Sequence, residues 1–193
     1  VSFIGQTQNY VPNTSLNAQT RDSEGAGLSI STGDENVFAG DSAGRNTSTG
    51  SRNVLVGYRT GFYSTSATDN TFVGHEAGRG VTTSTADSDN TFIGARAGYV
   101  NDATDNTFIG AAAGYNNTTG FDNVFIGEEA GYNVTTGDDN VFVGEDAGGS
   151  IGTGDDNTAI GNQAMGSRFS FNATYPASYQ NTAVGNNALS DIG

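Results

Sequence analysis

The segment DNTFIGAAAGYNNTTGFDNVFIGEEAGYNVTTGDDNVFVGEDAG, from Asp105 to Gly148, contains nearly the same seventeen residues three times. Units of the form N-[TV]-[FLA]-[IVA]-G occur nine times in the chain, with their asparagines spaced by 17, 17, 20, 16, 17, 17, 17 and 24 residues. Such a period is typical of repeat proteins, in which each unit stacks on the next. We number each repeat from its asparagine, position 1, so that the glycine is position 5.

The composition taken alone would predict disorder. Leu, Ile, Val and Phe make up just under a fifth of the 193 residues, and the formal net charge is -14. Such a chain has little apolar surface to offset the entropy of folding. A disordered chain does not hold a repeat in register over nine units, however, so we predict a folded repeat protein.

Charge and cysteine content exclude several kinds of partner and site. The chain has no lysine, and its seven arginines oppose 21 acidic residues. We therefore expect no nucleic-acid binding and no contact with an anionic membrane surface. The absence of cysteine excludes disulfides and thiolate metal sites. No apolar run is long enough to span a bilayer, and because the chain starts at Val1 we expect a mature protein or an excised fragment.

The residues within one repeat favour strands over helices. Positions 2 to 4 are β-branched or aromatic, as in Val141–Val143, whereas glycine at position 5 and usually at position 9 disfavours a helix. We expect a corner at position 5, a second short strand such as Glu128–Tyr132, and a polar return loop. The predicted fold is all-β: a β-solenoid, or β-roll, of 17-residue coils stacked about 4.8 Å apart.

Both faces of the predicted strand are apolar. Positions 2 and 4 point to one side and position 3 to the other, and we expect positions 2 and 4 to fill the coil. Position 3 would then expose a stripe of large side chains, more than soluble monomers usually expose. We expect a homo-oligomer that buries this stripe in a shared core, rather than a monomer with a capping helix or a wider coil. The predicted core residues are Phe38, Leu55, Phe72, Phe92, Phe108, Phe125 and Phe142.

The last two repeats carry a family resemblance. The units NTAIGNQAM (Asn157 to Met165) and NTAVGNNAL (Asn181 to Leu189) resemble the head repeats of YadA-like trimeric autotransporter adhesins. They are also similar to the N-T-A-V-G repeats of phage tail-fibre-like proteins. The resemblance covers residues 34–193 and implies a homotrimeric β-roll with a role in attachment at a surface. The seventeen-residue period is longer than usual for those heads, and Phe at position 3 is bulkier than the residue usual there.

Breaks in the repeat divide the chain into three parts. Residues 1–33 are predicted to form a degenerate first coil with a cap or tip, residues 34–165 the regular coils, and residues 166–193 an aromatic insertion and the last repeat. A smaller expansion lies at residues 79–89. The aromatic insertion is a candidate glycan-binding loop, and the alternative, which we favour, is that its rings pack the loop onto the trimer or seal a joint to the next domain. Its candidate residues are Arg168, Phe169, Phe171, Asn172, Tyr175 and Tyr179.

The recurring polar residues have structural explanations. His75 is the only histidine, so we predict no catalytic residue and no enzyme activity. Aspartate at position 17 is expected to form local turns, with calcium binding as the alternative, and we predict no cofactor and no metal. Position 1 is expected to form a ladder of stacked amides. This ladder comprises Asn36, Asn53, Asn70, Asn90, Asn106, Asn123, Asn140, Asn157 and Asn181.

These observations lead to two functional hypotheses. The first is a non-enzymatic trimeric fibre or adhesin head module that attaches to a cell-surface receptor or glycan. It would be extracellular, at a cell surface, or part of a phage-tail-like fibre, and threefold multivalency would strengthen weak contacts. The second is a ligand-binding β-solenoid whose regular outer face binds ice or calcium.

Overall fold

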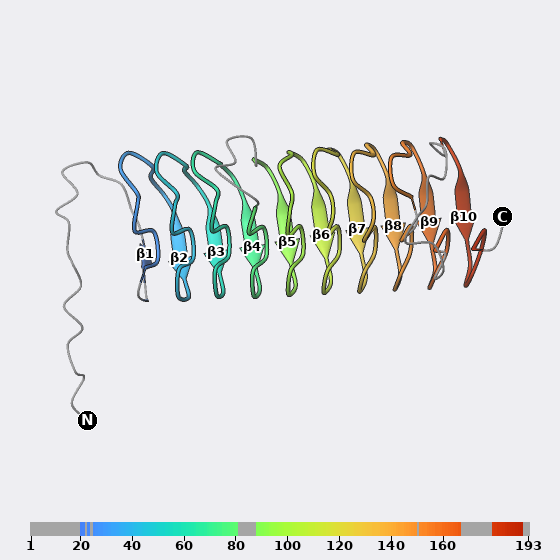
Figure 1. Ribbon diagram of the computed structural model, residues 1–193, viewed down its shortest axis with the longest axis horizontal. Coiled ribbons are helices and arrows are strands. Elements are labelled where there is room, and N and C mark those ends of the chain that lie inside the picture. Colours follow the sequence, from blue (N-terminus) through green and yellow to red (C-terminus); the bar gives the residue numbers. More distant parts are fainter. Residues whose placement is uncertain are drawn as a thin grey trace, which may run out of the picture.

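The computed structural model describes residues 20–21, 23, 25–80, 88–149, 151–166 and 179–190. These residues form a rod of stacked coils, and each coil contributes one short strand. The strands follow one another along the rod in sequence order, from β1 to β10 (Figure 1). Ten strands form a single parallel sheet in sequence order, so the all-β solenoid prediction is confirmed. The strands are β1 Thr20–Arg21, β2 Val37–Ala39, β3 Val54–Val56, β4 Thr71–Val73, β5 Thr91–Ile93, β6 Thr107–Ile109, β7 Val124–Ile126, β8 Val141–Val143, β9 Thr158–Ile160 and β10 Thr182–Val184.

The strands pair so that equal repeat positions align. Phe108 pairs with Phe125 across β6 and β7, and Phe125 pairs with Phe142 across β7 and β8. The 20-residue and 24-residue gaps do not disturb this register, since β4 pairs with β5 and β9 with β10 at the same positions. The strands on either side of each longer repeat therefore keep the register of the seventeen-residue coils. The sheet also begins earlier than residue 34, because β1 pairs with β2.

The second strand predicted for each coil is absent, and turns take its place. Glu128–Tyr132 consists of turns, and both Glu129 (φ 55°) and Gly131 (φ 62°) adopt the left-handed conformation. The same two positions, 7 and 9, are left-handed in coil after coil. Because this backbone folds back tightly, each coil is thin and has room for one large side chain.

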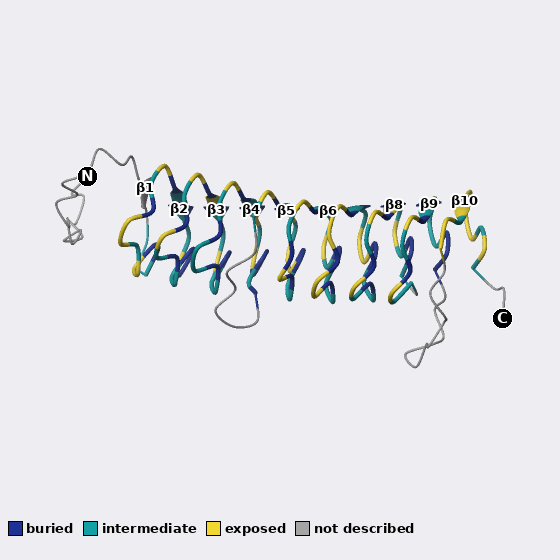
Figure 2. Ribbon diagram, turned by 90° about the horizontal axis from the view of Figure 1, so that it is seen from above, coloured by how far each residue is buried: buried dark blue, intermediate teal, exposed yellow. Residues whose placement is uncertain are grey.

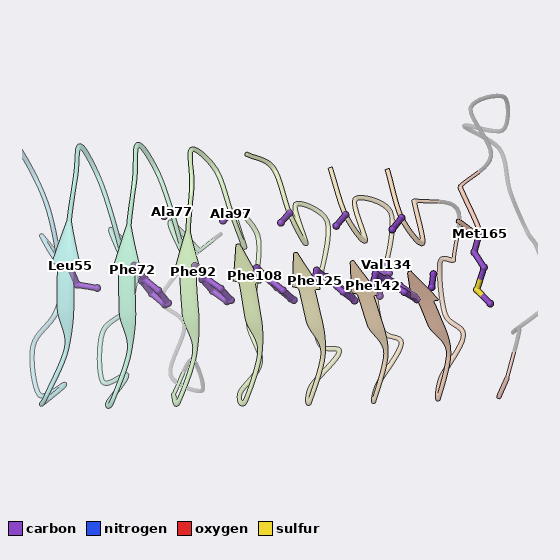
Figure 3. Packing of buried hydrophobic residues seen from close by; sticks show 14 of the residues in the cluster. Leu55, Phe72, Ala77, Phe92, Ala97, Phe108, Phe125, Val134, Phe142 and Met165 are labelled. Carbon is purple, nitrogen blue, oxygen red and sulfur yellow. The ribbon is translucent and has the colours of Figure 1, made fainter. Parts of the chain in front are cut away.

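That side chain is the residue at position 3, and the prediction that it lies in a core shared between chains is wrong. The seven residues predicted there, Phe38, Leu55, Phe72, Phe92, Phe108, Phe125 and Phe142, are all at most 1 % exposed in the single chain. From Phe72 to Phe142 their rings stack along the rod with centroids 4.7–5.0 Å apart (Figure 3). The column of residues at position 3 is thus the core of one chain.

Glycine at position 9 makes room for each ring. A Cβ on Gly131 would lie 2.4 Å from the Cδ2 atom of Phe125, well inside van der Waals contact. The coil of Ala159 solves the same packing problem in reverse, whereas Leu189 in the last coil is 43 % exposed. In these two coils position 3 is Ala159 or Ala183, and position 9 is Met165 or Leu189. Met165 has a left-handed backbone (φ 52°) and a buried side chain that supplies the missing volume.

Candidate functional site

The outer face of the sheet exposes apolar side chains along the whole run of paired strands. Positions 2 and 4 point outward, not into the coil as predicted, because position 3 occupies the interior. Position 2 is either Val or Thr in every coil from β2 to β10, and position 4 is Val or Ile in every coil from β3 to β10. Ile93 is 39 % exposed, Ile160 41 % and Val184 67 %. The result is two parallel columns of β-branched side chains, which we call the sheet face.

The asparagine ladder fixes the strands behind the sheet face. The Nδ2 group of Asn140 donates to the Oδ1 atom of Asn123 at 3.1 Å and to the carbonyl oxygen of Gly154 at 2.8 Å. Its own Oδ1 atom accepts the backbone N–H of Asn157 at 3.0 Å. Backbone-to-side-chain bonds of this kind link each asparagine to the preceding one, from Asn36 to Asn181. The predicted ladder is present, and it holds neighbouring coils in one register.

Glycine at position 5 brings the coils together at the end of each strand. A Cβ on Gly127 (φ 138°) would lie 2.3 Å from the carbonyl oxygen of Gly144 in the next coil. Gly110 and Gly144 meet the following coil in the same way. No other residue combines this φ with this approach, so the sheet face ends at the same point in every coil.

The acidic residues before each strand stand at positions 16 and 17, and the two positions have different roles. Aspartate at position 17, as in Asp105 (φ 61°) and Asp122 (φ 55°), adopts the left-handed conformation that Asp and Asn tolerate better than most residues. The bonds to backbone N–H groups occur one position earlier. Asp138 accepts the N–H of Phe121 at 3.0 Å, and Asp155 accepts that of Asp138 at 3.0 Å. Both are contacts between coils, not local turns.

Electrostatics along this edge differ between the two halves of the rod. Arg52 donates two hydrogen bonds to Asp69, at 2.6 and 2.7 Å, and these lower the pKa of that exposed carboxyl. Burial raises the pKa of Asp138, and the nearby carboxylates Asp155, Asp139 and Asp122 add to this effect. Among the described residues no three His, Cys, Asp or Glu side chains come together as a metal site.

The turn after each strand carries aromatic and arginine side chains that the sequence did not single out. The rings of Tyr99, Tyr115 and Tyr132 stack 4.9 and 5.1 Å apart along the rod. Arg79 lies over the ring of Tyr99 at 5.2 Å and continues this column. His75 is exposed and stacks on Tyr58, which suits a variable outward position.

The candidate glycan loop falls mostly on residues that the structure does not describe. Arg168, Phe169, Phe171, Asn172 and Tyr175 lie outside the described residues, as does the start of the N-terminal segment, residues 1–19. Tyr179 is described: its side chain is 56 % exposed, and its backbone carbonyl accepts the Nδ2 group of Asn181.

Two features of the site were readable from the sequence but were missed. The exchange of Phe–Gly for Ala–Met and Ala–Leu at positions 3 and 9 indicates that these positions touch, and therefore that position 3 is internal. A strand with an internal position 3 must turn positions 2 and 4 outward. The column at position 10 was visible as Tyr99, Tyr115 and Tyr132 at the repeat spacing.

In comparisons with known proteins, no family model, no curated protein and no solved structure matches the chain. Within the described part of the chain, no helix is long and apolar enough to cross a membrane.

Proposed function

We propose that the chain is a non-enzymatic structural module: a rod that assembles with two further copies of itself and holds an attachment surface at a distance. The observation that carries this proposal is the sheet face, an uncharged and largely apolar surface of Val, Ile and Thr side chains that runs along the paired strands outside the core. Exposed apolar patches of this extent commonly mark interaction surfaces. The interface predicted at position 3 is wrong, so the proposal rests on the exposure of positions 2 and 4 instead.

Three copies follow from the resemblance of the last repeats to trimeric adhesin heads. Three flat faces turned toward one axis form a closed prism in which each face is covered equally by its two neighbours. Closed symmetry of this kind is the rule for homo-oligomers. Val and Ile at position 4 and Val or Thr at position 2 contain no charge, so they can pack in such a core without an ion-desolvation cost.

The role in attachment also rests on the resemblance and on the shape of the rod. A stiff rod carries a binding loop away from its base, and three parallel loops raise avidity for a repeated ligand. The aromatic insertion around residues 166–180 is the proposed contact with a cell-surface receptor or glycan, and the location would be extracellular, on a cell surface or in a phage-tail-like fibre. A glycan array probed with the folded oligomer, with Tyr179→Ala as a variant, tests this part.

Sedimentation equilibrium tests the assembly. The chain mass is 19.7 kDa, and we expect a species of three times that mass at micromolar concentration. Ile126→Asp places a charge at the centre of the sheet face and should give a folded monomer. Thr119→Asp places the same charge on an exposed loop and should leave the trimer intact. A wild-type monomer at that concentration, or a trimer that tolerates Ile126→Asp, would contradict the proposal.

Binding to an ordered lattice such as ice is the second candidate, and one observation favours it. Thr71, Thr91 and Thr107 lie on the outward side of three successive paired strands, at the spacing of a parallel sheet, where the sequence analysis had expected them to face inward. A thermal hysteresis assay separates the two candidates. Ice shaping that disappears in Thr91→Tyr would support the lattice reading, and its absence at millimolar protein would exclude it.

A further inference from the structure

The column of large side chains at position 10 runs along much of the rod and stops in the coil of β7. From β2 to β7 its members are Arg45, Phe62, Arg79, Tyr99, Tyr115 and Tyr132. In the next two coils the same position is glycine, Gly149 and Gly166. The column therefore ends at Tyr132, one coil before Gly149.

The ring of Tyr132 has a neighbour in the column on one face only. It stacks on Tyr115 at 5.1 Å, and its other face is directed toward the coil of Gly149. The two coils are joined at this point, because the Nδ2 group of Asn133 donates to the carbonyl oxygen of Gly149 at 2.7 Å. We call the space beside this second face of Tyr132 the ring slot.

Neither the backbone nor crowding by the described residues requires glycine at position 149. The N–H of Gly149 donates to the carbonyl oxygen of Asp146 at 3.2 Å, and the N–H of Tyr132 makes the equivalent bond to Glu129 at 3.1 Å. The turn is thus the same in both coils, and in one of them it carries a tyrosine. Gly149 does not have a left-handed φ, and among the described residues only the backbone of Asp146 lies within 4 Å of where its Cβ would stand. The glycine leaves the slot open toward the side-chain direction.

The other end of the tyrosine column shows which group covers a tyrosine ring in this rod. Arg79 stands at position 10 in the coil of β4, and its guanidinium lies over the rings of Tyr63 and Tyr99, at 5.1 and 5.2 Å. Glu76, three residues earlier at position 7, pairs with Arg79 at 3.6 Å. Ring, guanidinium and carboxylate therefore form one unit, in which the cation is held by the ring face and by an acid.

Two parts of this unit recur at the ring slot. Tyr132 supplies the ring, and position 7 is acidic in both adjoining coils, as Glu129 and Asp146. Burial raises the pKa of Glu129, and Asp146 and the other nearby carboxylates raise it further, so the surroundings of the slot are negative. The third part is missing from this stretch, because the sequence has no arginine and no lysine between residues 97 and 167.

We propose that the ring slot binds the guanidinium group of an arginine side chain that a partner protein presents. The group lies over the second face of Tyr132 and donates hydrogen bonds to the carboxyl groups of Glu129 and Asp146. A guanidinium suits both contacts, because it is planar, stacks on aromatic rings and carries its five donors in one plane. The net charge of -14 favours the approach of a partner with a cationic surface.

This site is independent of the proposed trimer and of the proposed glycan contact. It uses position 10 and the acidic residues at position 7, whereas the trimer uses positions 2 and 4 of the sheet face. An arginine probe can therefore fail to bind while the sedimentation and glycan experiments succeed, and the reverse result is equally distinguishable.

A capped tripeptide with arginine at its centre tests recognition by the full chain. Saturation-transfer NMR reports weak binding of such a peptide to a large protein. We expect the arginine peptide to bind about tenfold more tightly than the same peptide with citrulline, which has nearly the same shape and no charge. Tyr132→Leu should weaken binding about tenfold, whereas Tyr99→Leu should have little effect because Arg79 and Tyr115 already cover that ring. Equal binding of the two peptides, or equal effects of the two variants, would overturn the proposal.

The chain has one cation of its own near the slot in sequence, Arg168, which lies outside the described residues. The peptide titration is therefore repeated in Arg168→Ala, and we expect the same affinity as in the native chain. Binding that occurs only in Arg168→Ala would mean that the chain fills the slot itself, and this result would also overturn the proposal.

Filling the slot from within the chain tests its geometry without a partner. Gly149→Arg places a guanidinium at the position that Arg79 has in its own coil. It should raise the melting temperature by about 2–4 °C more than Gly149→Gln, which adds a polar side chain without charge. The arginine peptide should no longer bind to Gly149→Arg. A Gly149→Arg chain that is no more stable than Gly149→Gln, or that still binds the peptide as the native chain does, would contradict the assignment.

Discussion

The inner and outer sides of each strand carry similar apolar chemistry but have different surroundings. Inside, Phe125 is fully buried between two like rings and against Gly131. Outside, Ile126 and Val124 on the same strand are only half-buried. The difference shows that the thin coil encloses the position-3 side chain of each strand but not those at positions 2 and 4. Figure 2 shows buried and exposed stretches following each other along every coil. The outer side chains depend on something outside the chain, and the predictions below separate these two sides.

The largest expected effect is on the inner column. Phe125→Ala removes a ring that stacks on Phe108 at 4.8 Å and on Phe142 at 5.0 Å, and it leaves a cavity. A substitution of this kind costs about 3–5 kcal/mol. Urea unfolding followed by circular dichroism measures this loss. Ile126→Ala on the outer side should cost far less when it is made in the monomer expected from Val141→Asp, compared with Val141→Asp alone. Equal losses at the two sites would contradict the division into inner and outer sides.

The asparagine ladder should come next in magnitude. Asn140→Ala leaves the buried carbonyl of Gly154 and the buried amide of Asn157 without the partner that Asn140 supplies. Each lost partner costs about 1–3 kcal/mol. Asn116→Ala is the control, because Asn116 is half-buried and its side chain makes a longer bond of 3.4 Å. Hydrogen exchange around β8 should increase in the first variant and stay unchanged in the second.

The exchange of volume between positions 3 and 9 predicts a rescue. Gly131→Met alone should destabilise the coil, since its Cβ would collide with Phe125. Combined with Phe125→Ala it should recover part of the stability, about 1–2 kcal/mol, because Met165 fills the same space beside Ala159 in the native chain. A double-mutant cycle on melting temperature provides the test. If the losses of stability in Gly131→Met and Phe125→Ala simply add in the double variant, positions 3 and 9 do not fill the same space.

The smallest expected effect is a pH dependence at the acidic end of the rod. Burial raises the pKa of Glu129 above its ordinary 4.5, and the carboxylates Asp146, Glu128 and Glu145 raise it further. The folded chain therefore holds a proton more readily than the unfolded chain between the two pKa values. Stability from this group falls as pH rises through that window and is constant below it.

We therefore expect the melting temperature to rise slightly from pH 7 to about pH 5, with a smaller rise in Glu129→Gln. Asp69→Asn serves as the control. Hydrogen bonds from Arg52 lower the pKa of Asp69 below its ordinary 3.8, so its contribution is lost only in stronger acid. The assignment would be contradicted if the melting temperature of the wild-type chain fell between pH 7 and about pH 5 and Glu129→Gln abolished that fall.

The sequence predicted the coil and misassigned its sides. Periodic asparagine and glycine are sufficient to predict stacked coils, because their roles in the ladder and at the corner follow from one repeat alone. Which side of Val141–Val143 faces inward depends on how far away the opposite wall lies, and that distance is set by left-handed residues such as Glu129 and Asp146. Glutamate and aspartate at position 7 do not by themselves predict a left-handed backbone. The paired changes at Ala159 and Met165 held the missing information.

The central claim is that the outward face is covered by other copies of the chain, and the reactivity of an introduced thiol measures this directly. Ile126→Cys should react slowly with a maleimide at micromolar protein and quickly when Val141→Asp is added, while Thr119→Cys on the exposed loop reacts quickly in both backgrounds. A cysteine at position 126 that reacts as fast as the one at position 119 in the otherwise native chain would show that the sheet face is open to solvent and would contradict the account.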